Sequence, residues 1–220
     1  MKFLVVSKKK WNSNNFLNLP NSLKFSKKIN SKILGKIKPK IIFFIHWSEK
    51  IPKKIFKRYL CIQFHSSDLP YFKGGSPIQN QILRGLKKTK ISAFKVEQNF
   101  DVGKICMKKT LSLSGSAYEI FKRLEKISIF MINKIIKKNS IKFFKQKGKG
   151  SFFSRRHPEE SNIKYISNPN LKKIYDFIRM LDADDYPNAF INFKEFKLLL
   201  NEAKTYKNGI NGKFRIIKKK

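Results

Sequence analysis

Three short apolar runs near the start of the chain constrain its fold more than any other feature. They are KFLVV at 2–6, PKIIFFIH at 39–46 and LCIQFH at 60–65. Runs of this length, rich in β-branched and aromatic residues, are typical of strands buried on both faces of a sheet. The segments between them, 11–19 and 52–59, carry capping residues or a starting proline, so both are predicted helices. This alternation predicts a parallel α/β sheet with right-handed crossovers.

The remainder of the chain also contains predicted helices and strands, but they do not alternate regularly. Residues 116–139 place apolar side chains three and four apart, which predicts a long amphipathic helix. No G-x-G-x-x-G sequence occurs, so the fingerprint of a dinucleotide site is absent. The other predicted elements are a helix at 76–86, strands at 90–100 and 104–113, a flexible charged link at 145–151, a helix at 170–183, strand material at 189–204 and a small hairpin with a basic tail at 207–220.

The formal net charge of +36 is a weak guide to partners. A basic surface favours phosphate, so a nucleic-acid-binding module stays open as an alternative, with salt-dependent binding as its mark. However, the chain has 43 lysines and only 7 arginines, and the lysines are spread along all 220 residues. This distribution indicates a general drift in composition rather than a binding patch.

The cysteines and the apolar runs bear on the compartment. Cys61 and Cys106 lie in separate apolar runs without metal-ligand spacing, so we expect buried, reduced thiols and no metal site. The N-terminal apolar run is too short for a signal peptide, and the run at 41–45 is far too short to cross a membrane. These observations predict a cytoplasmic protein without membrane association.

His65 stands at the predicted end of a strand. In open parallel sheets, ligands bind outside the carboxyl ends of the strands. Gly74 and Gly75 follow, where backbone can approach a ligand, and Asp101 lies at the end of a later predicted strand, two residues before Gly103. An imidazole beside a carboxylate forms an acid–base pair suited to neutral pH. From spacing alone, a hydrogen-bonding bystander histidine and an ordinary Asp-x-Gly turn remain the simpler alternatives.

Five short sequence blocks, taken in their order along the chain, are more specific than the spacing of His65 and Asp101. They are Gln63-x-His65, SSDLPYFKGGSP at 66–77, KISAFKVEQNFDVGKI at 90–105, RRHPEESNI at 155–163 and DYPNAF at 185–190. This order resembles the formyltransferases that use 10-formyltetrahydrofolate, over residues 40–125 and 152–190. The resemblance implies a Rossmann-like sheet with flanking helices, a catalytic domain at 1–145 and a short C-terminal extension at 146–220 made of a helix and a small β element.

The resemblance also implies roles for the site residues. His65 would stabilise the oxyanion formed when an amine attacks the formyl carbon, and Asp101 would hold the imidazole and help remove the amine proton. Gln63 replaces the family asparagine, so its amide is displaced by one methylene, and a slow or inactive relative stays an alternative. The pterin slot would be lined by His46, Trp47, Ile51, Asn99 and Phe100, and the acceptor would meet Ser66, Pro70, Gly74 and Gly75. For His46 and Trp47, ordinary loop packing is an equal alternative.

The acceptor is not fixed by these residues. The amine of an amino-sugar nucleotide or similar small metabolite is our first prediction, methionyl-tRNA the second and the glycinamide ribonucleotide of purine synthesis the third. The tRNA enzymes of this kind carry a C-terminal tRNA-binding barrel, and only about thirty residues follow position 190, fewer than an independent barrel of ordinary size requires. A homodimer is a further expectation from the resemblance to sugar enzymes.

Overall fold

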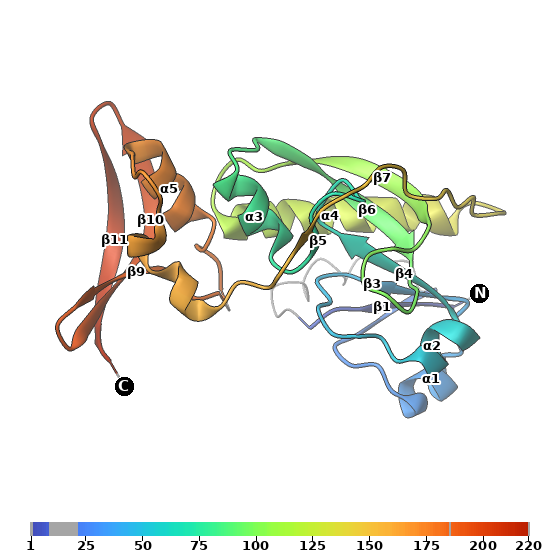
Figure 1. The fold of residues 1–220 in the computed structure, drawn as a ribbon. Helices are drawn as coiled ribbons and strands as arrows, with labels where there is room; N and C mark the ends of the chain where they lie inside the picture. Colours follow the sequence, from blue (N-terminus) through green and yellow to red (C-terminus); the bar gives the residue numbers. More distant parts are fainter. Residues whose placement is uncertain (1, 9–21, 185, 220) are drawn as a thin grey trace. The chain divides into compact units, whose positions relative to one another are not determined.

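The computed structural model describes residues 2–8, 22–184 and 186–219, so the helix predicted at 11–19 lies outside the described residues. These residues form two compact units (Figure 1). The first comprises Met1–Gly74, Thr89–Leu111 and Lys122–Phe152, and the second comprises Gly75–Lys88, Ser112–Phe121 and Phe153–Lys220.

The first unit is built on a six-stranded sheet with the strand order β2-β1-β3-β4-β6-β7. Strands β1 to β4 pair in parallel, while β6 joins β4 antiparallel. A mostly parallel sheet with flanking helices is the α/β class that the sequence predicted. The strands are β1 (Phe3–Val6), β2 (Leu23–Ser26), β3 (Ile41–Phe44), β4 (Leu60–His65), β6 (Lys88–Lys95) and β7 (Ile105–Ser112).

Both faces of the central strands are buried, as continuous apolar runs predict. One face packs against α1 (Ser31–Ile37) and α2 (Lys53–Arg58), through a cluster that includes Leu34 and Ile55 of the helices and Ile42 and Phe44 of β3. Figure 1 shows α1 and α2 close together beside these strands. Phe43 points to the opposite face, where its ring lies 6.5 Å from that of Phe3. Burial on both faces fixes the register, because a slip of one residue would exchange the two faces.

The second unit contains α3 (Pro77–Leu83), α5 (Leu171–Arg179) and an antiparallel sheet with the order β11-β10-β9. Its strands are β9 (Ala189–Phe193), β10 (Phe196–Tyr206) and β11 (Gly209–Lys218), and α5 packs against β10. Two 3₁₀ turns, η3 (Pro158–Ser161) and η4 (Ile163–Tyr165), precede α5. The long helix α4 (Ala117–Ile136) begins in this unit and continues in the first.

Arg179 ties α5 to the connection between β7 and α4. Its guanidinium donates to the carbonyl oxygens of Leu113 and Gly115, at 2.6 and 2.7 Å, and pairs with Asp176 at 2.7 Å. Arg179 and Asp176 are both buried. Because a buried guanidinium must have its donors satisfied, this residue stabilises the end of α5 and the following connection together.

Three predictions about local structure are wrong. Residues 22–38, for which the sequence predicted no helix or strand but only a lysine-rich connection to the run at 39–46, contain β2 and α1, since an edge strand and a short surface helix tolerate lysine on their exposed sides. The strand predicted at 90–100 ends at Lys95, and the following residues form a loop. The segment 207–220 does not fold on itself: Asn211–Gly212 lies within β11, opposite an irregularity in β10 between Asn201 and Lys204.

The link at 145–151 is also not the flexible connection that its composition suggested. The backbone of Ser151 bonds to Pro70 and Lys73, at 3.2 and 2.9 Å, and the side chain of Gln146 bonds into the loop before β7. The two-residue strands β5 (Lys73–Gly74) and β8 (Phe152–Phe153) pair at the same place. The lysines and glycines of this segment are typical of a flexible link, but backbone hydrogen bonds hold the segment in place.

The two cysteines differ in their degree of burial. Cys61 is buried in the sheet, as predicted, and burial raises the pKa of its thiol to about 12. Cys106 is only half-buried, and desolvation raises its pKa to about 11. Among the described helices, none combines the length and the apolar character needed to cross a membrane.

Candidate active site

The end of β4 and the loop between β6 and β7 bring His65 and Asp101 together, although 36 positions separate them in the chain. His65 Nδ1 lies 3.5 Å from Asp101 Oδ1, and the side chains are only 8% and 6% exposed. The other carboxylate oxygen of Asp101 accepts a hydrogen bond of 2.8 Å from the backbone N–H of Gly74. The structure therefore joins three residues that the sequence had selected separately.

The second ring nitrogen of His65 is also engaged. His65 Nε2 lies 2.7 Å from the carbonyl oxygen of Phe72. A carbonyl oxygen only accepts, so Nε2 is the donor in this contact, and Nδ1 faces Asp101. Both ring nitrogens of His65 therefore face groups of the protein itself.

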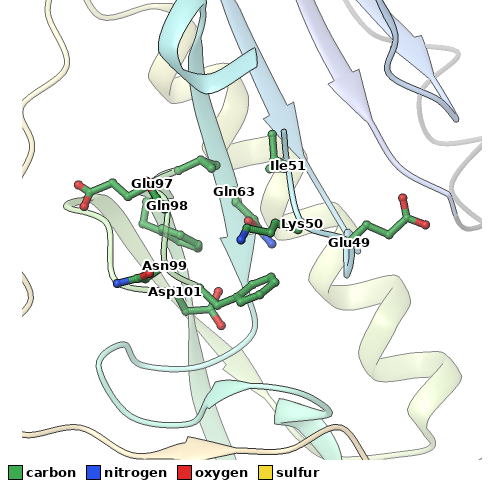
Figure 2. Close-up of a pocket in the computed structure, with 11 residues that line it drawn as sticks. Glu49, Lys50, Ile51, Gln63, Glu97, Gln98, Asn99 and Asp101 are labelled. Atoms are coloured by element: carbon green, nitrogen blue, oxygen red, sulfur yellow. The ribbon is translucent and has the colours of Figure 1, made fainter. Parts of the chain in front are cut away.

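A small, partly open cavity lies beside Asp101. Figure 2 shows Gln63 near its centre, with Glu49 and Glu97 directed away from it on opposite sides. Its apolar walls come partly from Ile51 and Phe100. The complete lining is Glu49, Lys50, Ile51, Gln63, Phe94, Val96, Glu97, Gln98, Asn99, Phe100 and Asp101. Apolar walls with polar groups at the edge are the kind of lining that a flat ring system with polar edges requires.

Gln63 reaches across the cavity floor to the neighbouring loop. Its Nε2 donates a hydrogen bond of 3.1 Å to the backbone carbonyl of Trp47, at the end of β3. The amide has a second N–H, which the Trp47 carbonyl does not use. The glutamine that replaces the expected asparagine thus connects two walls of the cavity.

The predicted binding residues divide into two groups. Ile51, Asn99 and Phe100 line the cavity, whereas His46 and Trp47 do not. Trp47 packs its ring at 5.6 Å from that of Phe44, in an edge-to-face arrangement. For Trp47 this geometry favours the loop-packing alternative, and its backbone carbonyl is the part that serves the site.

The predicted acceptor-binding residues lie outside the cavity lining. Ser66 and Pro70 are buried in the loop after His65. Gly74 contributes its N–H to Asp101, while Gly75 belongs to the second unit. A side chain at Gly75 would place its Cβ 2.3 Å from the Cα of Arg155, so this position requires glycine.

Asp68 supports the loop that follows His65. Its carboxylate pairs with Lys90, at 2.9 Å, and with Lys108, which also donates to the carbonyl of Leu69 at 2.6 Å. Burial acts to raise the pKa of Asp68, but the hydrogen bonds from Lys108 and Lys90 outweigh it and hold the pKa below its ordinary value. Lys90 of β6 and Lys108 of β7 are thereby connected to the loop after His65 by ion pairs.

Sequence reasoning missed several residues of this site. Lys50 and Gln98 line the cavity within segments that were selected for other residues. Gln146 lies in the segment regarded as a flexible link, yet its amide donates to the carbonyl oxygens of Asp101 and Gly103. A lone glutamine among lysines and glycines carries no recognisable signal in one sequence.

Comparison with known proteins gives a consistent result. A family model described as "Formyl transferase" matches residues 3–124, more than half of the chain. A second, described as "Methionyl-tRNA formyltransferase, C-terminal domain", matches residues 158–217, which hold α5 and the three-stranded sheet.

Individual relatives match to different extents. A methionyl-tRNA formyltransferase of Rickettsia felis is 34% identical over 96 residues, or 43% of this chain. That match spans about a third, 31%, of the relative's length. The solved structure of a methionyl-tRNA formyltransferase from Clostridium thermocellum shares 39% identity and a TM-score of 0.90, over 99% of both chains. A sugar N-formyltransferase from Shewanella sp FDAARGOS_354 shares the fold, with 16% identity, a TM-score of 0.70, and coverage of 94% and 99% of the two chains.

Proposed function

This chain belongs to the formyltransferase family, and on that premise we propose that it transfers a formyl group from 10-formyltetrahydrofolate to a primary amine. The observation that carries the proposal is the contact of Asp101 with His65 and with the N–H of Gly74, at the edge of a cavity that Gln63 and Asp101 share. A buried carboxylate beside an imidazole and an amide donor is the set of groups that acyl transfer to nitrogen requires.

The cavity suits the pterin end of the folate. Ile51, Phe94 and Phe100 supply apolar walls for a flat ring, and Asn99 and Gln98 supply polar groups along its edge. We propose that the folate carries the formyl group on its nitrogen and that these residues orient the formyl carbon toward Asp101.

The reaction assigns one role to each site residue. The amine nitrogen attacks the formyl carbon, a C–N bond forms, and the bond from that carbon to the folate nitrogen then breaks. Asp101 accepts the proton that the amine loses and returns it to the departing folate nitrogen. The free N–H of Gln63 donates to the tetrahedral oxygen, where charge develops.

The geometry modifies the role first expected for His65. Its Nδ1 faces Asp101, so His65 supports the charge of Asp101 from behind the cavity. Its Nε2 donates to Phe72 and reaches the tetrahedral oxygen only where that contact opens. We therefore propose Asp101 and Gln63 as the groups that meet the substrate, and His65 as their partner.

The first candidate acceptor is the amine of an amino-sugar nucleotide or similar small metabolite. The described C-terminal residues form an open sheet of three strands, with β9 and β11 at its edges.

Methionyl-tRNA is the second candidate, and a specific observation favours it. The relative with 39% identity over 99% of the chain is named as a methionyl-tRNA formyltransferase, and the C-terminal family model carries the same name. The net charge of +36 is compatible with a polyanionic acceptor.

One experiment tests the reaction and separates the acceptors. Purified protein is incubated with 10-formyltetrahydrofolate and either a panel of amino-sugar nucleotides or methionyl-tRNA, and formation of tetrahydrofolate and of the formylated amine is followed. We expect product with an amino-sugar nucleotide, formed about 100- to 10,000-fold more slowly by Asp101→Asn. Product with methionyl-tRNA alone would establish the second candidate, and no product with any primary amine would refute the transferase.

A further inference from the structure

We propose that Gln146 is a positioning residue, whose side-chain amide holds the turn that presents the carboxylate of Asp101 to the cavity. The inference rests on the proposed function, since it concerns the same site. It arises from a residue on the segment at 145–151, more than forty positions after Asp101.

The backbone of Asp101 needs external support. Its φ of +56° lies in the left-handed region, which residues with a side chain seldom adopt. This conformation directs the carboxylate toward the ring of His65 and the N–H of Gly74, at 3.5 and 2.8 Å. A turn in an extended backbone conformation would lose both contacts, so the position of the carboxylate depends on what holds the turn.

Gln146 supplies that support with both of its N–H groups. Its Nε2 donates to the carbonyl oxygen of Asp101 at 2.8 Å and to that of Gly103 at 3.0 Å. Two carbonyl oxygens can be met only by the NH₂ end of the amide, so the orientation of the side chain is fixed. The amide therefore spans the turn and connects its first and third residues.

The segment that carries Gln146 is itself held in register. Ile105 and Phe144 exchange two backbone hydrogen bonds, of 2.8 and 2.9 Å, which attach residue 144 to the start of β7. Gly103 fixes the other side of the turn, because a Cβ there would lie 1.7 Å from the carbonyl oxygen of Lys95. Between these anchors, the amide of Gln146 sets the peptide plane that follows Asp101.

The chemical consequence is preorganisation. A carboxylate accepts a proton from an attacking amine most efficiently when the folded protein already holds it in the reactive position. Gln146 touches no substrate in this proposal and acts only through Asp101. Its loss should lower turnover while leaving the sheet and both units folded.

The test combines Gln146→Met with amide hydrogen exchange of the full-length protein. Methionine keeps the length and approximate volume of glutamine but donates nothing. We expect exchange at Gly74, whose N–H is bonded to Asp101, to accelerate by about tenfold or more, on the scale of one lost hydrogen bond. Exchange at Lys73, whose N–H is bonded to Ser151 at 2.9 Å, should stay unchanged. Lys147→Met places the same side chain at the exposed neighbouring position as the matched control.

Turnover gives the second readout. We expect Gln146→Met to lower kcat by about 10- to 100-fold, the range for two lost hydrogen bonds. In an Asp101→Asn background, the same substitution should cost much less, because both changes act on one group. Equal losses in the two backgrounds would overturn the proposal.

The exchange data remain decisive if the protein transfers no formyl group, so failure of the proposed function is distinguishable from failure of this inference. Faster exchange at Gly74 alone supports a positioning role without any measurement of turnover. Unchanged exchange at Gly74, or equal acceleration at Gly74 and Lys73, would overturn it, because Gln146 would then be irrelevant to Asp101 or a general support of the fold.

Discussion

The side-chain amide of Gln63, on β4, donates a hydrogen bond to the backbone carbonyl of Trp47, in the loop that follows the neighbouring parallel strand β3. An asparagine at position 63 would be one methylene shorter, by about 1.5 Å along the chain, and would not reach this carbonyl at 3.1 Å. The replacement of the family asparagine therefore coincides with a new connection between β4 and the loop after β3.

Substitution of Gln63 separates its contact with Trp47 from its proposed role as a hydrogen-bond donor to the substrate. Gln63→Asn keeps an amide beside the cavity but loses the contact with Trp47, so we expect turnover to persist with a raised KM for the folate. Gln63→Leu removes both donors and should lower kcat/KM by about 10- to 100-fold, on the scale of one or two lost hydrogen bonds. Steady-state kinetics with varied folate distinguishes the variants, and equal behaviour of the two would contradict the assignment.

Asp101→Asn should abolish most of the transfer, since an amide cannot accept the amine proton. A loss of about 100- to 10,000-fold in kcat is the range for a missing general base. His65→Ala should also lower kcat strongly, because Asp101 loses the partner that lies 3.5 Å away. Circular dichroism should show both variants folded. Wild-type turnover in either one would remove the pair from the mechanism.

Gly103→Ala tests the packing of the loop before β7. Its Cβ would overlap the carbonyl oxygen of Lys95 at 1.7 Å, so the loop must shift. Overpacking of this kind costs about 1–3 kcal/mol of the free energy of unfolding, and the cavity wall at residues 98–101 should move with it. Thermal unfolding and binding of a stable folate analogue measure the two effects. Gly35→Ala, where no atom lies within 4 Å of the new Cβ, is the matched control.

The lowered pKa of Asp68 predicts that the stability of the folded protein depends on pH. Its pKa is lowered in the folded protein, so its contribution is complete above the pKa of the unfolded chain, about 3.9, and is lost as the pH falls through the lower folded value. Asp68→Asn should therefore lower Tm at pH 7, and the difference should shrink below about pH 4. Scanning calorimetry from neutral to acid pH measures this, with exposed Asp184→Asn as control. A difference that grew in acid would contradict the assignment.

Arg179→Met should destabilise the second unit. The change leaves Asp176 without its buried guanidinium partner and two carbonyl oxygens without their donor. Loss of one member of a buried pair costs about 3–5 kcal/mol of the free energy of unfolding. Urea denaturation measures the cost, and Arg215→Met, on the exposed side of β11, provides the comparison. Equal, small effects of both substitutions would mean that Arg179 has no special role.

The sequence predicted more of the sheet than of its surroundings. β1, β3 and β4 follow from largely apolar runs, since burial on both faces favours apolar side chains at most positions of a strand. β2 escaped prediction because it alternates lysine with apolar residues at an edge of the sheet, and α1 escaped because a short helix with one buried leucine has little periodicity. His65 and Asp101 were found through the positions of strand ends and a familiar order of motifs.

What the sequence by itself determined is the identity of the groups at the site: a histidine, a carboxylate, an amide and glycines, placed where strands end. Only the tertiary structure decided their arrangement. It placed Asp101 and Gln63, rather than His65, in the lining of the cavity, because the carbonyl of Phe72 holds one ring nitrogen and Asp101 faces the other. It also brought Gln146 to the turn at Asp101. The physical reason is that hydrogen bonds between distant segments depend on positions set by packing, which no local pattern of residues records.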